Sequence, residues 1–296
     1  MSPDSRKVPV QVDGRAIALS NLDKVLYPAT GFCKAQVIDY YHRIAPVLLP
    51  HIDARPVTIK RYPDGVAGES FFQKNAPPHR PDWVPTGPVA VRDRASSQKT
   101  IDYIIGGDLP TLIWAANLAA LELHTPMWRY PEQDPDLLVF DLDPGPPASI
   151  VQCCEVATLL RPLLSEMGLA PAAKTSGGKG LQLYAAVSGM TSPQASDLAK
   201  GLAERLEREH PRLVVSRMAK ALRPGRILID WSQNNAAKTT VAPYSLRARE
   251  RPTVSTPITW DEVAACRVAG DLVFTADDVL DRVATSGDLF EITLSN

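Results

Sequence analysis

The chain has 296 residues, of which 45% are hydrophobic and 22% charged, and these ordinary proportions exclude a disordered chain, a coiled coil and a collagen-like fibre. Its 32 basic and 33 acidic residues give a net charge of −1, which taken alone argues mildly against a nucleic-acid partner. The length suggests one large domain or two small ones.

Cysteine spacing and hydropathy exclude further classes. The four cysteines include no Cys-x-x-Cys pair, so the sequence predicts neither a zinc site nor a thioredoxin-type motif. No apolar run is long enough to span a membrane, and the polar N-terminal segment lacks the apolar core of a signal peptide. We therefore expect a reduced, cytoplasmic protein with no membrane partner.

In chain order, apolar spacing predicts a first helix over residues 34–52 and a largely buried second helix over residues 110–123, with His124 at its end. Short strands are expected between these helices, at residues 57–60 and 70–73. A histidine that closes an apolar helix is more often structural than functional, so by itself His124 carries no assignment.

The second half of the chain alternates strands and helices. Strands are predicted at residues 137–141, 181–187 and 227–231, and helices at residues 151–167 and 192–209. Capping boxes that begin at Thr259 and Thr275 predict two small helices near the end. Because the elements are intermixed without a regular βαβ rhythm, the sequence favours the α+β class.

Asp141 and Asp143 stand at the end of an apolar strand. Side chains alternate along a strand, so both carboxylates project the same way and repel each other when ionised. A divalent cation between them removes this repulsion, and oxygen-only ligands favour Mg²⁺ or Mn²⁺. Asp230, in the apolar segment ILIDW, would complete a two-metal site for phosphoryl transfer. The alternatives are a surface turn with solvated aspartates and, for Asp230, an edge strand facing solvent.

The segment SGGKG at residues 176–180 is a candidate phosphate-binding loop. Glycines let backbone N–H groups converge on anionic oxygens, and Lys179 adds a positive charge. The spacing is not that of a Walker motif, and a glycine-rich hairpin turn is an equally open alternative. The position of the loop, one helix after Asp143, favours a nucleotide site.

The even charge balance hides two opposed blocks. Residues 215–251 contain eight basic and two acidic side chains, whereas residues 261–296 contain eight acidic and two basic ones. A solvated charged face is the usual reason for such runs. Here the basic block surrounds Asp230, so basic character is confined to one working surface that suits a polyanionic substrate.

Taken in order, the segments LLVFDLDPG, KTSGGKGL, ILIDWSQN and KTTVAPYSLRAR resemble the primase-polymerase domain of bacterial DNA ligase D, a family of the archaeo-eukaryotic primase superfamily. The resemblance extends from about residue 21 to about residue 288. It implies a single α+β primase-polymerase domain with an N-terminal α/β module (about 1–130), an RRM-like catalytic module (131–260) and C-terminal helices (261–296).

The resemblance also implies a role for each matching residue. Asp141, Asp143 and Asp230 would be the catalytic residues and would hold two Mg²⁺ or Mn²⁺ ions. The matching nucleotide-binding positions are Ser176, Lys179, Gly180, Gln182, His124, Arg247 and Lys60. The positions that match DNA-binding residues are Lys24 and Lys34 for a downstream 5′-phosphate, Phe71 and Phe72 for template stacking, and Lys220 and Arg223 in a mobile loop near the primer. The two phenylalanines could instead belong to the core.

One position departs from the family pattern. Where the family usually continues Lys-Gly-Leu-His, this chain has Gln182. An amide can still donate a hydrogen bond to a phosphate, but it cannot become cationic, so we expect altered triphosphate binding.

The function implied by the resemblance is a metal-dependent nucleotidyltransferase that binds gapped or broken DNA and fills short gaps from NTP or dNTP, with a preference for ribonucleotides, in end joining or excision repair. A DNA ligase and the end-binding protein Ku are the partners it suggests. A loop at about residues 92–105 would bring two DNA ends together. Two alternatives remain: a non-catalytic DNA-end-binding protein, which Gln182 favours, and a haloacid dehalogenase-like phosphatase, which also places Asp-x-Asp after a strand.

Overall fold

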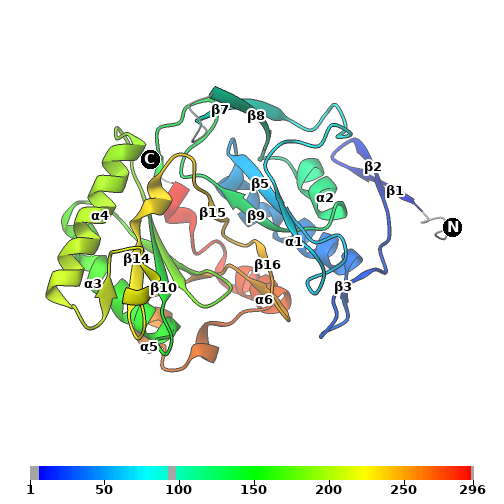
Figure 1. The fold of residues 1–296 in the computed structure, drawn as a ribbon. Coiled ribbons are helices and arrows are strands. Elements are labelled where there is room, and N and C mark those ends of the chain that lie inside the picture. Colours follow the sequence, from blue (N-terminus) through cyan, green and yellow to red (C-terminus); the bar gives the residue numbers. More distant parts are fainter. Residues whose placement is uncertain (1–6, 93–97, 295–296) are drawn as a thin grey trace.

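Two six-stranded sheets, each covered by a pair of helices, make up the centre of the computed structural model, which describes residues 7–92 and 98–294 (Figure 1). The sheet that carries Asp141, Asp143 and Asp230 is called the catalytic sheet after the role expected for these residues. Its order is β13 (Val214–Val215), β14 (Ile227–Asp230), β10 (Leu137–Pro144), β12 (Leu181–Ala186), β11 (Ala172–Thr175) and β18 (Pro257–Ile258). In the N-terminal sheet the order is β15 (Thr240–Val241), β9 (Ala120–Thr125), β5 (Pro56–Arg61), β8 (Gln98–Ile105) and β7 (Thr86–Arg92), and β6 (Phe71–Gln73) also pairs with β5. This mixture of helices with mainly antiparallel sheets confirms the α+β class.

Helices α3 (Ile150–Glu166) and α4 (Ser192–Glu209) cover one face of the catalytic sheet, on the left of Figure 1. Leu138, Phe140 and Leu142 of β10 are completely buried in the core that these helices share with the sheet. Because side chains alternate along a strand, Asp141 and Asp143 project from the opposite face of the sheet.

Helices α1 (Lys34–Ile52) and α2 (Leu109–Asn117) pack with the N-terminal sheet around a separate core. Smaller elements complete the chain: the hairpins β1–β2 (Val8–Val12, Arg15–Leu19), β3–β4 (Val25–Tyr27, Phe32–Cys33) and β16–β17 (Leu246–Ala248, Pro252–Val254), and the helices α5 (Trp260–Ala265) and α6 (Ala276–Ser286). Within the described ranges, no helix has the length and apolar character needed to cross a membrane.

Most elements lie close to their predicted bounds, but the helix predicted over residues 110–123 is wrong in its second half. Helix α2 ends at Asn117, and Ala119 adopts a left-handed backbone conformation with φ of +57° that turns the chain back as β9. All six residues of β9 are buried because β5 and β15 pair with it on either side. His124 therefore lies on a central strand and does not end a helix. An unbroken buried apolar run does not distinguish the two structures by periodicity alone.

The predicted loop over residues 92–105 is also largely a strand. Gln98–Ile105 forms β8, which pairs with β7 from Gln98 to Ile104. Residues 93–97 lie outside the described residues.

A buried ion pair joins the N-terminal elements to β10. Arg55, only 1% exposed, donates to Asp136 Oδ2 at 2.6 Å and to the carbonyl oxygens of His51 and Pro126 at 3.0 and 3.3 Å. Asp136 immediately precedes β10 and also accepts from Arg129 Nε at 2.8 Å. This contact therefore anchors the start of β10, the strand that carries Asp141 and Asp143.

Replacing Arg55 by methionine should strongly destabilise the protein, because Asp136 and two carbonyl groups lose a buried donor. Breaking a buried pair by removing one partner costs about 3 kcal/mol or more. The change would be measured as a lower urea midpoint. Arg43→Ala, which removes an exposed pair with Asp39 at 3.7 Å, is the control and should change the free energy of unfolding by less than about 0.5 kcal/mol. An equal effect of both variants would contradict the role given to Arg55.

Candidate active site

Three aspartates meet on the face of the catalytic sheet that points away from helices α3 and α4. In the antiparallel pairing, Asp141 lies directly opposite Asp230 of β14 on one side and opposite Gln182 of β12 on the other. Asp143 lies two residues further along β10, on the same face. Asp230 is 9% exposed, Asp141 and Asp143 are half-buried, and β13 shields β14 from the sheet edge. The alternatives of a solvated surface turn and an exposed edge strand are therefore wrong.

This carboxylate cluster, Asp141, Asp143 and Asp230, brings three acidic side chains together, with Lys238 Nζ 4.0 Å from Asp230 Oδ2. Burial, with the nearby charges of Asp143 and Asp230, raises the pKa of Asp141 to about 7. Burial and Asp230 likewise raise the pKa of Asp143, against the opposing charge of Arg223. Such a set of repelling oxygen donors fits a hard divalent cation.

Neighbouring donors engage two of the three carboxylates. Asp230 accepts from the Ser232 backbone at 3.1 Å and from Gln233 Nε2 at 3.0 Å, while Asp141 accepts from Gln182 Nε2 at 2.9 Å. Among the described residues, no three His, Cys, Asp or Glu side chains are already arranged to hold a metal ion.

The loop at residues 176–180 packs directly against β10. Ser176 Oγ accepts from Gly178 N at 3.3 Å and from Gly180 N at 3.1 Å, which closes the loop. A Cβ atom at Gly180 would lie 2.5 Å from the carbonyl oxygen of Leu142, so only glycine allows this approach. Lys179 is exposed at the tip.

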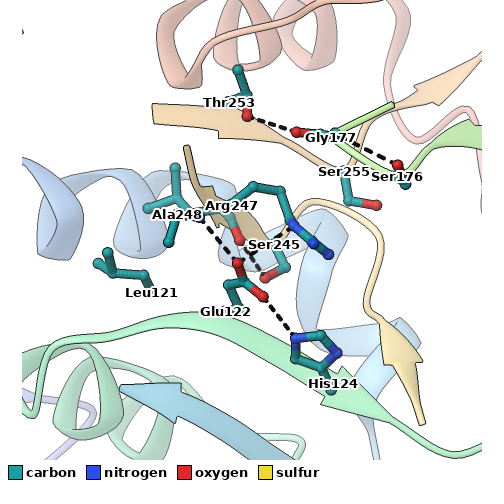
Figure 2. Close-up of polar contacts among 12 residues, drawn as sticks. Leu121, Glu122, His124, Ser176, Gly177, Ser245, Arg247, Ala248, Thr253 and Ser255 are labelled. Atoms are coloured by element: carbon teal, nitrogen blue, oxygen red, sulfur yellow. Dashed lines mark hydrogen bonds and ion pairs between the residues drawn. The ribbon is translucent and has the colours of Figure 1, made fainter. Parts of the chain in front are cut away.

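A basic cluster, Lys60, His124 and Arg247, lies beside this loop and is organised by a buried carboxylate. Glu122 of β9, 3% exposed, contacts His124 Nε2 at 2.9 Å, the backbone N of Ala248 at 3.1 Å and Arg247 Nε at 3.5 Å (Figure 2). Burial would raise the pKa of Glu122, but the hydrogen bond from His124 and the charge of Arg247 outweigh it and lower the value to about 2. Burial lowers the pKa of His124, and Glu122 opposes this shift.

Arg247 connects the basic cluster to the glycine loop. It lies on β16, and its Cγ occupies the space that a Cβ atom at Gly177 would enter, at 2.5 Å. Gly177 has φ of +65°, and its carbonyl oxygen accepts from Thr253 Oγ1 at 2.8 Å (Figure 2). Hairpin β16–β17 thus carries Arg247 to a position between the loop and Glu122.

The two exposed phenylalanines of β6 face in opposite directions. Phe72 pairs across the strands with Lys60, whose Nζ lies 5.1 Å from the ring, and its centroid is 5.3 Å from that of His124. Phe71 pairs with Arg61, whose guanidinium lies 5.2 Å from the ring. With exposed fractions of 46% and 55%, neither side chain belongs to the core. Phe72 borders the basic cluster, and Phe71 lies on the other face.

Lys24 and Lys34 are brought together by hairpin β3–β4, where Lys34 N donates to Lys24 O at 2.9 Å. Lys24 Nζ pairs with Asp64 Oδ1 at 2.8 Å, and Lys34 Nζ donates to Ser20 O at 2.7 Å. Burial, together with the charges of Lys24 and Arg61, lowers the pKa of Lys34 to about 8. The two lysines and Arg61 form a local excess of positive charge.

The segment that carries Lys220 and Arg223 packs against the turn after Asp143. Gly225 N donates to the carbonyl oxygen of Gly145 at 3.0 Å. A Cβ atom at Gly145 would lie only 2.0 Å from the carbonyl oxygen of Arg223. Lys220 is exposed in a short 3₁₀ turn, whereas Arg223 is half-buried.

The sequence argument missed two buried charged residues that join these groups, Glu122 and Lys174. Lys174 of β11 is completely buried and contacts Gln182. Each is a charged residue inside an otherwise apolar strand segment, LELH for Glu122 and AAKT for Lys174. Burying a charge is costly, so a charged residue among apolar ones could have marked both positions, as it did for Asp230.

Comparison with known proteins identifies the family of this chain. The family described as "LigD, primase-polymerase domain" matches residues 33–290. The chain is 46% identical over 277 residues to the multifunctional non-homologous end joining protein LigD of Mycolicibacterium smegmatis, covering 92% of this chain and 35% of that protein. It is 32% identical over 273 residues to the bifunctional non-homologous end joining protein LigD of Bacillus subtilis, covering 92% and 43%. The chain thus spans less than half the length of these relatives.

A solved structure is also similar: the polymerase domain of Mycobacterium tuberculosis ligase D in complex with DNA. It has a TM-score of 0.87 and 44% sequence identity, and the match covers 94% of this chain and 98% of that one. A haloacid dehalogenase fold receives no support. The chain belongs to the LigD primase-polymerase domain family and is a nucleotidyltransferase.

Proposed function

We propose that this chain extends DNA 3′-ends at short gaps or breaks, as part of non-homologous end joining. One observation carries the proposal: the glycine loop at residues 176–180 packs against β10 of the carboxylate cluster on one side and against Arg247 of the basic cluster on the other. Negative oxygen donors beside fixed cations suit a metal-bound triphosphate. The relatives named as non-homologous end joining proteins and the DNA complex of the M. tuberculosis domain support the DNA substrate and the pathway.

In this proposal Asp141, Asp143 and Asp230 hold Mg²⁺ or Mn²⁺. When bound, these ions activate the primer 3′-hydroxyl and neutralise charge on the transferred phosphate. Arg247, His124 and Lys60, together with the loop at residues 176–180, bind the triphosphate. The 3′ oxygen attacks the α-phosphorus in line, the bond to the β-phosphate breaks, and pyrophosphate leaves. Fixed charges that need no reorganisation lower the barrier to this step.

Glu122 gives the triphosphate site its fixed geometry. Its carboxylate holds His124 through Nε2 and lies against Arg247, so neither side chain must be ordered when the nucleotide arrives. The proposed preference for ribonucleotides rests on the family resemblance, and parallel assays with NTP and dNTP test it.

At the downstream side, we assign the 5′-phosphate to Lys24 and Lys34. Asp64, which is 78% exposed, is the only partner of Lys24 in the described structure, and an exposed pair of this kind contributes little stability. A terminal phosphate can therefore displace it. Phe71, on the face shared with Arg61, is suited to stack on an unpaired template base near that phosphate, and Phe72 on one near the incoming nucleotide.

Asp141→Ala and Asp143→Ala should each lower primer extension on gapped DNA by more than about a thousandfold while the fold is retained. The measurement is extension of a labelled primer with each nucleotide type, in Mg²⁺ and in Mn²⁺, with circular dichroism to check folding. Asp197→Ala, at an exposed position of α4, is the control and should keep full activity. Extension by either active-site variant would refute the assignment, and inactivity of the wild type would favour a non-catalytic end-binding protein.

The preference for phosphorylated gaps should fall as pH rises. Lys34 has a lowered pKa of about 8, so its ammonium is present at pH 7 and is lost above pH 8 unless binding draws in a proton. The phosphate stays dianionic across this range. The ratio of affinities for phosphorylated and unphosphorylated gaps, measured by fluorescence anisotropy, should therefore decrease between pH 7 and pH 9.5.

Lys34→Arg is the matched control, because a guanidinium stays charged and should make the ratio independent of pH. A ratio of one at every pH in the wild type would rule out a 5′-phosphate site. A wild-type ratio above one that does not change with pH would rule out Lys34 as the group responsible.

Gly145→Ala should disturb the segment that carries Lys220 and Arg223, which we propose to act near the primer end. Its Cβ atom would overlap backbone atoms of Arg223, so that segment must move, at a cost of about 1–3 kcal/mol. We expect both lower stability and slower extension. Gly201→Ala in α4, where nothing lies within 4 Å, is the control and should stabilise the protein by up to about 1 kcal/mol. Full extension activity in Gly145→Ala would contradict the role of the segment.

A further inference from the structure

Four residues form a continuous row across the catalytic sheet. The registers place Asp230 opposite Asp141, Asp141 opposite Gln182, and Gln182 opposite Lys174, on the neighbouring strands β14, β10, β12 and β11. Directly opposed residues share one face of a sheet, so the four side chains lie side by side. Two carboxylates occupy one end of this row and a lysine the other.

Lys174 has no carboxylate partner in the described structure, although it is completely buried. Its Nζ contacts Gln182 Oε1 at 2.5 Å, Ser255 Oγ at 2.7 Å and Val241 O at 3.0 Å. Ser255 Oγ donates its own proton to Thr175 O at 2.9 Å, so it accepts from Lys174. All three partners are therefore acceptors, and they use the three N–H groups of an ammonium.

These contacts decide which way the amide of Gln182 faces. Its Oε1 accepts from Lys174 and also lies 3.3 Å from the hydroxyl of Tyr184. A reversed amide would set its NH₂ group against the ammonium and remove an acceptor that Lys174 needs. The NH₂ group is thereby directed at Asp141 Oδ1, at 2.9 Å. Among the described residues, Asp141 Oδ2 accepts no hydrogen bond.

We propose that Lys174 is a positioning residue that, through Gln182, fixes Asp141 by its Oδ1 and leaves Oδ2 for a divalent cation. Resting on the function proposed above, this assigns Gln182 a different task from the histidine of the family. Gln182 is 4% exposed and both ends of its amide are engaged within the protein, so it serves the metal ligand rather than the triphosphate.

The neutral amide of Gln182 between Lys174 and Asp141 has a physical advantage. A lysine in direct contact with Asp141 would occupy a carboxylate oxygen and compete with the metal. Burial lowers the pKa of Lys174 well below its ordinary value, and the charge of Asp141 opposes this shift. The three acceptors around Nζ favour the ammonium, which acts on the carboxylate cluster through Gln182 without taking an oxygen from it. Groups that orient a metal ligand in this way typically change metal affinity by about 10- to 100-fold when removed.

The test is Mn²⁺ binding to the full chain without nucleotide or DNA, followed by electron paramagnetic resonance of the free ion. Asp141→Ala defines binding that depends on this site. Lys174→Met and Gln182→Met should each weaken Mn²⁺ binding by about tenfold or more. Lys74→Met, at an exposed lysine, is the control and should bind as the wild type does.

The double variant Lys174→Met with Gln182→Met distinguishes positioning from general disruption. If Lys174 acts through Gln182, the double variant binds Mn²⁺ no more weakly than Gln182→Met alone. Because it removes both partners of the hydrogen bond, it also provides a foldable variant if either single change unfolds the chain, as urea denaturation will show.

Wild-type Mn²⁺ affinity in Lys174→Met or in the double variant would overturn the proposal, and so would losses that multiply in the double variant. Equal binding by the wild type and Asp141→Ala would overturn it as well. A wild-type protein that binds Mn²⁺ through Asp141 but does not extend primers would refute the proposed function and leave this inference standing.

Discussion

Repulsion among three carboxylates on one sheet face is the constraint on which the rest of the site depends. Asp141, Asp143 and Asp230 cannot all be ionised at low cost unless positive charge is near. That charge comes from two lysines. Lys174 acts on Asp141 through the amide of Gln182, and Lys238 Nζ lies 4.0 Å from Asp230. Direct ion pairs would occupy the carboxylate oxygens that we propose as metal ligands, whereas these indirect contacts leave oxygens available.

The N-terminal sheet carries the groups that we propose to bind the anionic triphosphate. Here the buried Glu122 contacts His124 and lies against Arg247, although its own charge would oppose a triphosphate. Fixed geometry offsets this cost, since side chains that are already ordered lose little entropy on binding. In both halves of the site, unfavourable charge is thus present where side chains are held in fixed positions.

Alternation along a strand and motif order were enough to predict that Asp141, Asp143 and Asp230 converge, because these depend on local pattern. The strand β9 was not predictable in this way, since a fully buried run lacks the alternation that marks a strand. Nor could one sequence reveal that Lys174 opposes Gln182, or that Glu122 reaches Arg247. Such contacts depend on the register between strands and on loop paths, which no local pattern encodes.

The short strand β15 has a wider consequence. It follows the last aspartate of the catalytic sheet, yet it pairs with β9 of the other sheet, and its Val241 accepts from Lys174. The polypeptide thus returns to its first half before the site is complete. If one sheet were replaced by that of a distant homologue, the contacts of β15 with β9 and Lys174 would be disturbed. Substitutions in one sheet are therefore constrained by the residues of the other.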